Sequence, residues 1–313
     1  MDKRGVMYAC EILKDSLNSR GHRLTTMEIT YPRIVHGEVM THRKTSRNSA
    51  SSRAKPLEWV IAQVRRDPFI PEFWGKNQKG MQAYEELTGW RRWFAKRTWK
   101  TAMHMALVLA RMLDKLNLHK QLGNRILEPF CWHTIVITAT DWGNFFALRT
   151  DKAAQPEIRR IALLMQEAYE TSVPKVLTPG EWHKPYVDDD EGFSEMDGVK
   201  VSTGRCARNS YGTQHDKRAA EREIAMHDGL IADGHMSPTE HQARGLTDEE
   251  WDLLDRLAET IRTSNEGNAQ YRTTLLESVY TIGNFKGFMQ YRKTIPFEDD
   301  YSKVLAAAEL QPA

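Results

Sequence analysis

The spacing of apolar positions changes several times along this chain, and each change predicts a different element. Residues 24–31, LTTMEITY, are rich in β-branched and aromatic residues and predict a strand that ends at Pro32. The fixed φ of this proline suits the first turn of a helix, so a short helix through Ile34 and Val39 is expected next. Residues 134–140, TIVITAT, are too few and too β-branched for a helix and predict a second strand.

A spacing of three or four residues between apolar positions predicts helices elsewhere. Residues 57–118 are interpreted as mostly helical, with one apolar face made of Ala102, Met105, Ala106, Leu109, Leu113 and Leu116. They include the basic and aromatic segment 90–99, WRRWFAKRTW, for which a helix with its tryptophans inward is favoured over a stacking platform for bases. Two more helices are expected, one around residues 251–261 and one whose apolar face contains Ile158, Ile161, Met165 and Ala168.

Residues 177–198 interrupt these patterns with Pro, Gly and acidic residues and are the best candidate for a linker or a surface lid. We therefore expect two halves, residues 1–176 and 199–313, on either side of this segment. The combination of predicted strands and helices indicates an α+β fold.

Composition narrows the classes of function. The 313 residues are 40% hydrophobic and 27% charged, which is typical of a folded chain with a sizeable core. Forty-four Lys and Arg against 42 Asp and Glu leave a net charge of +2, too little to hold a polyanion by counterion release alone. Nucleic acid is therefore a disfavoured partner, and any phosphate binding must be local.

The same composition bears on location and on the thiols. No apolar run approaches the roughly 18–20 residues that span a bilayer, so we expect a cytoplasmic protein without a membrane partner. Cys10, Cys131 and Cys206 are too few and too far apart for a disulfide framework or a CxxC metal site. They are expected to be reduced and mostly buried.

The segment 41–53, THRKTSRNSASSR, carries the first signal for chemistry. It gathers five basic side chains among serines and an asparagine: His42, Arg43, Lys44, Arg47 and Arg53. An Arg side chain can bind two phosphate oxygens, and short hydroxyls can bind the others. Composition alone favours a solvated Arg/Ser linker, whereas the strand and helix predicted directly before the segment favour an ordered phosphate site.

Two further segments contain isolated cations. In residues 144–158, NFFALRTDKAAQPEI, Arg149 follows apolar positions and must find an anion, a carbonyl group or solvent. The alternative for Arg149 is an ion pair with its neighbour Asp151. Arg125 in GNRILEPF is a similar lone cation, for which a surface salt bridge is favoured.

The segment GHMSPTEH contains two histidines, His235 and His241, that flank a glutamate. Their separation of six residues does not match the HExxH zinc motif, so we expect no metal site. Ser237 either caps the following helix, with Glu240 near its N-terminus, or forms a pocket wall together with Glu240.

The chain contains no GxGxxG after a strand, no GxxxxGK[ST] and no GxSxG, but four segments together resemble the motifs of the flavin-dependent thymidylate synthases. Segment 41–53 resembles the family signature, an Arg-His-Arg triplet followed by a Ser and an Arg, here Ser51 and Arg53. NFFALRTDKAAQPEI resembles the family's Leu-Arg motif. CARNSY, with Ser210, resembles its Ala-Arg-x-Ser motif, and GHMSPTEH resembles its His-x-Ser-Pro-x-Glu-His motif.

The order of these motifs is unusual. Family members ordinarily carry the last two before the signature, whereas here both follow the Leu-Arg motif. The resemblance is therefore to a circularly permuted member, an arrangement that a fold tolerates when its termini lie close together. The C-terminal segment GNFKGFMQYRK would then replace the helix that normally precedes the signature, which makes Gln290 and Arg292 candidate pocket residues.

The resemblance implies a fold and an activity. The fold would be a mixed or antiparallel sheet with flanking helices and a long helical segment, in which residues 199–313 complete a flavin site. The enzyme would use FAD as cofactor, with NADPH and methylenetetrahydrofolate as co-substrates, to convert dUMP to dTMP. Family members are homotetramers whose active sites are shared between subunits.

The resemblance also implies roles for individual residues. Ser51, Arg53 and Arg125 would hold the nucleotide phosphate, with Gln290 and Arg292 as further substrate contacts. The candidate catalytic residues are Arg149, which would stabilise negative charge on the pyrimidine, and His235, near the flavin ring. The other cofactor contacts would come from His42, Arg43, Asn48, Asn144, Ser210, Ser237 and Glu240.

Several positions depart from the family pattern. Thr41 stands where the family has Arg, Ser49 where it has Glu, Ala54 where it has Tyr, and Ala153 where a His often occurs. Because two of these changes alter the charge of the pocket, methylation of dCMP, or hydroxymethylation of a pyrimidine deoxynucleotide, is an alternative. A nucleic-acid-binding helical protein is the alternative from another class.

Overall fold

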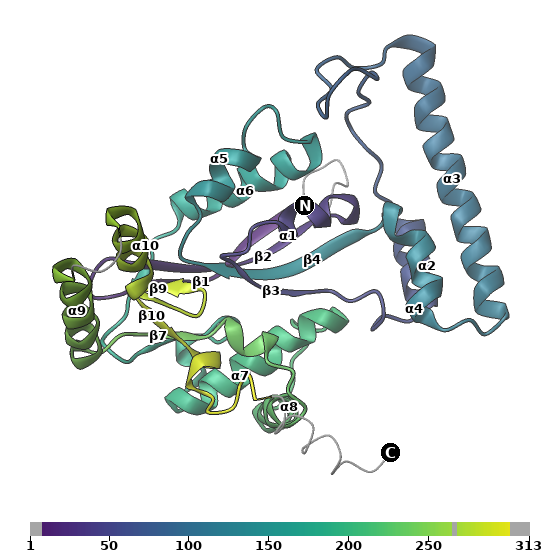
Figure 1. Ribbon diagram of the computed structural model, residues 1–313. Coiled ribbons are helices and arrows are strands. Elements are labelled where there is room, and N and C mark those ends of the chain that lie inside the picture. Colours follow the sequence, from purple (N-terminus) through teal and green to yellow (C-terminus); the bar gives the residue numbers. More distant parts are fainter. Residues whose placement is uncertain (1–7, 265–267, 301–313) are drawn as a thin grey trace.

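A five-stranded mixed sheet forms the centre of the computed structural model, which describes residues 8–264 and 268–300 (Figure 1). The strand order is β3-β4-β2-β1-β5, and all neighbours are antiparallel except β1 and β5. The strands are β1 (Ala9–Leu17), β2 (Arg23–Pro32), β3 (Ser46–Ser49), β4 (Trp132–Ala139) and β5 (Lys175–Val176). This arrangement confirms the expected α+β class with a mixed sheet.

Two smaller sheets lie beside the central one. A three-stranded antiparallel sheet has the order β10-β7-β6, and β8 pairs with β9 as a hairpin. Their strands are β6 (Trp182–His183), β7 (Ala243–Gly245), β8 (Thr281–Ile282), β9 (Phe285–Lys286) and β10 (Phe288–Gln290). Strands from residues 182 and 288 thus meet in one sheet, which joins distant parts of the chain.

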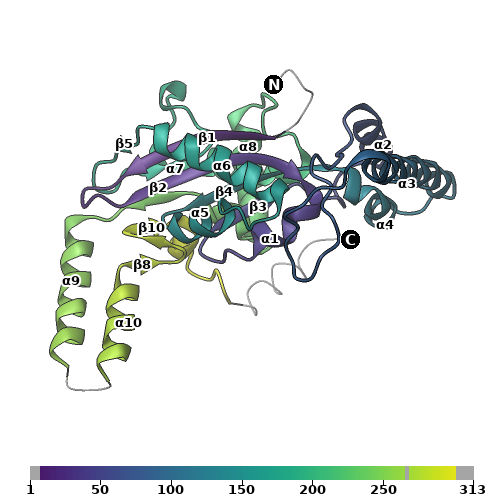
Figure 2. The same cartoon turned by 90° about the horizontal axis from the view of Figure 1, so that it is seen from above.

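Helices cover both faces of the central sheet and extend beyond its two ends (Figures 1 and 2). One face carries α5 (Gly143–Arg149) and α6 (Pro156–Thr171), and the other carries α7 (Glu195–Arg208) and α8 (Ala220–Ala232). At one end stand α2 (Leu57–Arg66), α3 (Gly89–Lys115) and α4 (Lys120–Gly123), and at the other α9 (Asp248–Thr263) and α10 (Ala269–Val279). The short α1 (His36–Met40) follows β2. No helix within the described ranges is long and apolar enough to cross a membrane.

The two faces of the central sheet differ in polarity because side chains alternate along β2. Met27, Ile29 and Tyr31 are fully buried and pack with Ile158 and Ile161 of α6. This contact confirms the predicted apolar face of α6, and each buried Ile side chain contributes about 1.5–3 kcal/mol. The alternate positions Thr26 and Glu28 are polar and lie on the opposite face, where Thr26 contacts His183 and Glu28 accepts hydrogen bonds from Tyr186 and Gln214.

Two predictions about the chain before α5 are wrong, and a third holds for most of its residues. Residues 46–49 form strand β3 within the expected loop. Residues 57–118 are mostly helical, as expected, because α2 and α3 make up more than half of them, although residues 67–88 between the two helices are irregular. The predicted apolar face of α3 is also wrong, because the structure buries Met103, Leu107 and Ala110 and leaves Met105, Leu109 and Leu116 at least half exposed.

The tryptophans of the segment 90–99 do not all point inward. Trp90 and Trp93 are exposed, whereas Trp99 is partly buried and contacts Phe69 and Trp74 edge to face. The prediction of inward tryptophans is therefore wrong for Trp90 and Trp93. Their exposure leaves a large apolar surface on α3.

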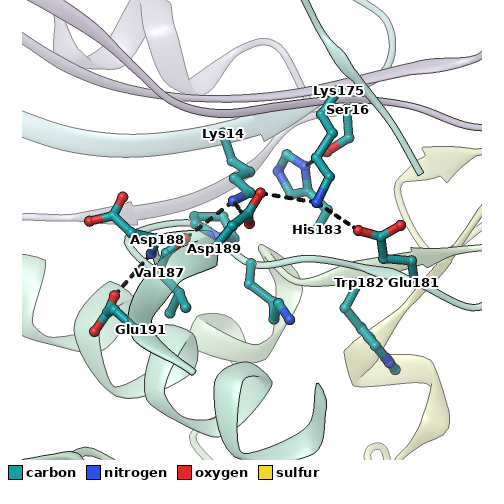
Figure 3. Close-up of polar contacts among 12 residues, drawn as sticks. Lys14, Ser16, Lys175, Glu181, Trp182, His183, Val187, Asp188, Asp189 and Glu191 are labelled. Atoms are coloured by element: carbon teal, nitrogen blue, oxygen red, sulfur yellow. Dashed lines mark hydrogen bonds and ion pairs between the residues drawn. The ribbon is translucent and has the colours of Figure 1, made fainter. Parts of the chain in front are cut away.

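Residues 177–198, the expected linker or lid, are held by ion pairs to the central sheet and by strand pairing to the three-stranded sheet. Lys14 of β1 and Lys175 of β5 donate to Asp189 at 2.7 and 3.0 Å and lower the pKa of this carboxyl group to about 2 (Figure 3). Trp182 and His183 pair with β7 and are buried. The segment therefore packs against both sheets, while the division into two halves stays a prediction.

Candidate active site

A cavity of about 780 Å³ opens beside β3, and four separate stretches of the chain line it. Six of the residues that the sequence analysis selects lie in its wall: Asn48, Ser51, Arg53, Ser210, His235 and Ser237. They belong to three different motif segments, so the fold brings together residues that are distant in the sequence. Hydroxyl, amide, imidazole and guanidinium groups in one concave site suit a polar ligand with phosphate groups.

Strand β3 connects the signature segment to the other two. It pairs with β4, and just beyond it the N–H of Ser51 donates to the carbonyl oxygen of Ser210 at 2.9 Å. The side chain of Asn48 is buried, and in the amide orientation that satisfies it the nitrogen donates to the carbonyl oxygen and Oγ of Ser237 at 3.3 and 3.2 Å. One short strand therefore fixes the cavity wall at two points.

Gln290 and Arg292 do not line the cavity but contact β3 and the turn 237–240, which contribute to its wall. The Gln290 amide donates to Oγ of Ser46 at 3.0 Å and to the carbonyl oxygen of Glu240 at 2.8 Å. Arg292 donates to Oε1 of Glu240 at 2.5 Å. Glu240 itself faces these partners and is absent from the cavity wall. The C-terminal segment thus positions β3 and the turn 237–240 relative to each other.

The turn 237–240 is also attached to the central sheet by a chain of buried hydrogen bonds. His241 Nδ1 lies 2.8 Å from Oγ1 of Thr138, Thr138 lies 2.8 Å from Oγ1 of Thr26, and Thr26 lies 2.8 Å from Nε2 of His183. Nδ1 of His183 lies 2.8 Å from Oγ of Ser16. All five side chains are fully buried. The alternative in which Ser237 caps a helix is wrong, because the turn has no side-chain cap.

His183 and His241, the two histidines of this chain of hydrogen bonds, predict that the protein loses stability in acid. Burial lowers the pKa of His183 and of His241 to about 3, whereas an unfolded His titrates near 6.5. Between these values only the unfolded state binds the protons, so stability falls as the pH falls from about 6.5 toward 3. Each histidine should cost about 1.4 kcal/mol per pH unit in this window. Urea unfolding at pH 7.5, 6 and 5 measures this slope.

A His241→Gln variant provides the control for this prediction. The variant removes one titrating group, so its pH slope should be smaller than that of the wild type by about 1.4 kcal/mol per unit. An unchanged slope would show that His241 does not titrate in the expected window.

Arg149 lies outside the cavity, at the end of α5 on the opposite face of the sheet from α7 and α8 (Figure 1). Its Nε donates to Nε2 of His42 at 3.0 Å, and its Nη2 donates to Oγ1 of Thr41 at 2.9 Å. Burial, and next the Arg149 cation, lower the pKa of His42, which therefore accepts as a neutral imidazole. The alternative partner is wrong, since Asp151 accepts from the N–H of Ala153.

Three more predicted residues lie away from the cavity. Asn144 and Arg43 are exposed and do not line it. Arg125 is exposed as well and pairs with Glu128 at 2.8 Å, which confirms the surface salt bridge. The Leu-Arg segment and the signature segment therefore contact each other through Arg149 and His42. Within one chain this contact lies away from the cavity.

The structure adds cavity residues that the sequence analysis missed. His119, Lys120 and Gln121 come from the start of α4, Tyr211 is the last residue of the CARNSY motif, and Asp233 directly precedes GHMSPTEH. Lys120 donates to the carbonyl oxygen of Ala54 at 3.0 Å, which places its ammonium group beside the signature segment. No motif marks residues 119–121, and only their proximity to residue 54 identifies them.

The thiols contribute no activated nucleophile to this site. Burial raises the pKa of Cys10 and of Cys131 to about 12, and it raises the pKa of Cys206 further. A thiol with a raised pKa is protonated and reacts poorly. Among residues 8–264 and 268–300, no three His, Cys, Asp or Glu side chains are grouped so as to hold a metal ion.

Residues 20–175 match the family model Thy1, described as thymidylate synthase complementing protein. This chain belongs to the Thy1 family. The Thy1 match contains the signature segment 41–53 and the Leu-Arg segment 144–158, and it ends before Ser210 and the turn 237–240. The permuted position of the other two motifs stays a prediction.

Two solved structures of the UMP/dUMP methylase PolB from Streptomyces cacaoi resemble this Thy1 chain. The structure bound with 5-Br dUMP is 18% identical, with a TM-score of 0.40 over 47% of this chain and 66% of that chain. The structure bound with 5-Br UMP is 17% identical, with a TM-score of 0.44 over 52% and 88%. The chain therefore spans just under two thirds of the first structure. No curated protein matches the sequence.

Proposed function

We propose that this chain is an FAD-dependent enzyme that methylates C5 of a pyrimidine deoxynucleotide, converting dUMP to dTMP with methylenetetrahydrofolate and NADPH. The cavity carries the proposal, because Ser51, Arg53 and His235 come from distant motifs and line it together. Membership of the Thy1 family supports the same reaction. The absence of an activated thiol agrees with a mechanism that does not begin with a cysteine nucleophile.

The cavity residues suit a flavin dinucleotide. Its volume of about 780 Å³ is within the usual size of cofactor sites. Ala207, Met226 and Leu230 offer an apolar wall, and Asn48 and Ser210 offer hydrogen-bonding groups. FAD held there by these residues would supply the redox chemistry of the reaction. Exposed His235, at the cavity wall, would contact the ligands that approach the ring.

The cationic side of the cavity suits the phosphate of the nucleotide. Ser51 and Arg53 come from the signature segment, and Lys120 and His119 approach from α4. An Arg fork and a Lys ammonium group bind phosphate oxygens by charge-assisted hydrogen bonds. Lys120 thus takes the place expected for Arg125, which is engaged with Glu128.

Arg149 would act at the cavity of a neighbouring copy. Its guanidinium group is held at a fixed position by His42, Thr41 and the carbonyl oxygen of Glu38. A fixed cation stabilises negative charge that develops on the pyrimidine ring. A homotetramer with shared sites would supply this group, together with His42 and Arg43, to a cavity that lacks it in the single chain.

Lys120 and Arg125 offer a direct comparison of phosphate binding. Lys120→Ala should raise the KM for the nucleotide about tenfold, because one charge-assisted contact is lost. Arg125→Ala, which removes a cation only five residues away but outside the cavity, should change KM less than twofold. Steady-state kinetics with varied nucleotide measure both. Equal effects of the two variants would contradict the assignment of Lys120.

The redox chemistry tests the proposed function itself. The purified protein, or the protein after addition of FAD, should be yellow, and anaerobic NADPH should bleach its absorbance. It should then release tritium from C5-labelled dUMP in the presence of methylenetetrahydrofolate. A protein that binds no FAD and exchanges no C5 hydrogen would contradict the proposal.

A cytosine substrate is the second candidate, and Thr41 favours it. This residue replaces a family arginine, and its hydroxyl group accepts from Arg149, so the pair carries one cation instead of two. Uracil has a carbonyl group where cytosine has an amino group, so the loss of a cation near the base weakens the preference for uracil. Parallel assays with C5-labelled dUMP and dCMP decide the base, and mass spectrometry of the product distinguishes a methyl from a hydroxymethyl group.

A further inference from the structure

Helix α3 is apolar on two opposite sides. Its inner side packs Met103, Leu107 and Ala110 against α2 and residues 124–130. Its outer side and edges form a second surface, here called the outer stripe, of eight large apolar side chains that are each at least half exposed: Trp90, Trp93, Phe94, Met105, Val108, Leu109, Met112 and Leu116. Figure 1 shows α3 along one edge of the molecule, with α2 and α4 on its inner side.

The outer stripe is larger than the apolar patches that single soluble chains usually leave exposed. The helix has 27 residues and is therefore roughly 40 Å long. Complete burial of the stripe would remove on the order of 800 Å² from each partner, the size of a standard specific interface. Patches of this size mark contact surfaces.

The charge of α3 indicates what covers the stripe. Residues 89–100 contain five cations and no acidic side chain: Arg91, Arg92, Lys96, Arg97 and Lys100. Cations near the N-terminus of a helix are unfavourable because that end of the helix dipole is positive. The C-terminal end of a second, antiparallel helix would reduce this effect, since it brings carbonyl groups and Asp114 beside these cations and carries only two cations of its own, Arg111 and Lys115.

We propose that two copies of this chain associate by antiparallel packing of α3 against α3, about a two-fold axis near residue 103. In this arrangement Trp90 and Phe94 of each copy lie opposite Leu116 and Met112 of the other. The same patch serves both copies, as a two-fold interface requires. A parallel arrangement would instead bring the two basic ends together.

This interface would adjoin the cavity described above. Helix α3 ends at Lys115, four residues before His119, which lies in the cavity wall. The basic first turns of α3 from the other copy would therefore lie near the phosphate side of the cavity. The pairing itself rests on the outer stripe and its charge, and it stands or falls separately from the proposed reaction.

A pair of matched variants tests the pairing. Met105 of the outer stripe and Leu253 of α9 are both 60% exposed, so Met105→Glu and Leu253→Glu make the same change at equal exposure on two helices. Sedimentation velocity should show dissociation of the Met105→Glu assembly with at least a tenfold higher Kd, while Leu253→Glu assembles like the wild type. Circular dichroism should show unchanged folding of both.

Single cysteines test the antiparallel geometry. Met105→Cys lies near the proposed axis and should form dimers with a short bismaleimide linker. Trp90→Cys should not, because its two copies lie roughly 39 Å apart along the helices. A mixture of Trp90→Cys and Leu116→Cys chains should link to each other. Wild-type protein controls for the partly exposed native Cys10.

Several results would overturn the proposal. A wild-type chain that is monomeric at tens of micromolar, or an assembly that Met105→Glu leaves intact, excludes α3 as the contact. Efficient linking of Trp90→Cys to itself excludes the antiparallel arrangement. A monomer that binds a single-stranded oligonucleotide, and loses this binding in Trp90→Ala, would assign the outer stripe to nucleic acid instead.

Discussion

Arg149→Ala is expected to lower tritium release from C5-labelled dUMP by about 100- to 1,000-fold while FAD remains bound, because a positioned cation of this kind contributes a few kcal/mol to the transition state. The guanidinium group is oriented by His42 and Thr41, so the variant removes a fixed charge and leaves the packing of α5 unchanged. Tritium release and flavin absorbance measure the two halves of this prediction. Full activity of the variant would remove Arg149 from its assigned role.

Mixing two inactive variants tests whether Arg149 acts across a subunit boundary. Arg53 lines the cavity and Arg149 does not, so in a shared site they come from different copies. Random reassembly of Arg53→Ala with Arg149→Ala should then restore about a quarter of the activity, the fraction of sites that receive both arginines. No recovery would place both residues in the same copy.

The second large effect is expected at the buried ion pair between Arg208 and Glu223. These side chains are each 1% exposed and 2.9 Å apart, and the pair joins α7 to α8 beside the cavity. Glu223→Ala should lower the free energy of unfolding by about 3–5 kcal/mol, because it leaves the Arg208 charge buried without its partner. Urea unfolding at pH 7.5 measures the loss.

A more exposed pair on the same helix provides the control. Arg205 and Glu191 form two hydrogen bonds at 2.6 Å, but their side chains are 18% and 25% exposed. Glu191→Ala should therefore cost less than Glu223→Ala, since water can solvate the remaining charge. A double variant, Arg208→Met with Glu223→Leu, should recover most of the stability. Equal losses at the two pairs would contradict this account.

Elements that depend on local residue pattern were predictable. Residues 24–31, 134–140 and 251–261 were expected as two strands and a helix, and all of them except Thr140 lie in β2, β4 and α9. Strand β3 was not predictable, because its residues SRNS lack the β-branched and aromatic side chains that favour strands. It is a strand because the edge of β4 offers backbone groups that must be paired.

The orientation of α3 shows a different limit. Its sequence contains two apolar stripes, one through Met105 and Leu109 and one through Met103 and Leu107, and periodicity cannot rank them. The position of α2 and of residues 124–130 decides which stripe is internal. The wrong prediction of the buried face of α3 follows directly from this ambiguity.

The amino-acid order alone determined the class of fold, the main strands and helices, and the motif residues, since these follow from local spacing and side-chain chemistry. Only the tertiary structure decided which motif residues share a cavity: Ser51 and His235 do, while Arg149 and Gln290 do not. It also decided that Lys120 lines the cavity while Arg125 pairs with Glu128 outside it. The physical reason is that a binding site depends on distances across the sheet and between helices, and those distances are set by packing of the whole chain.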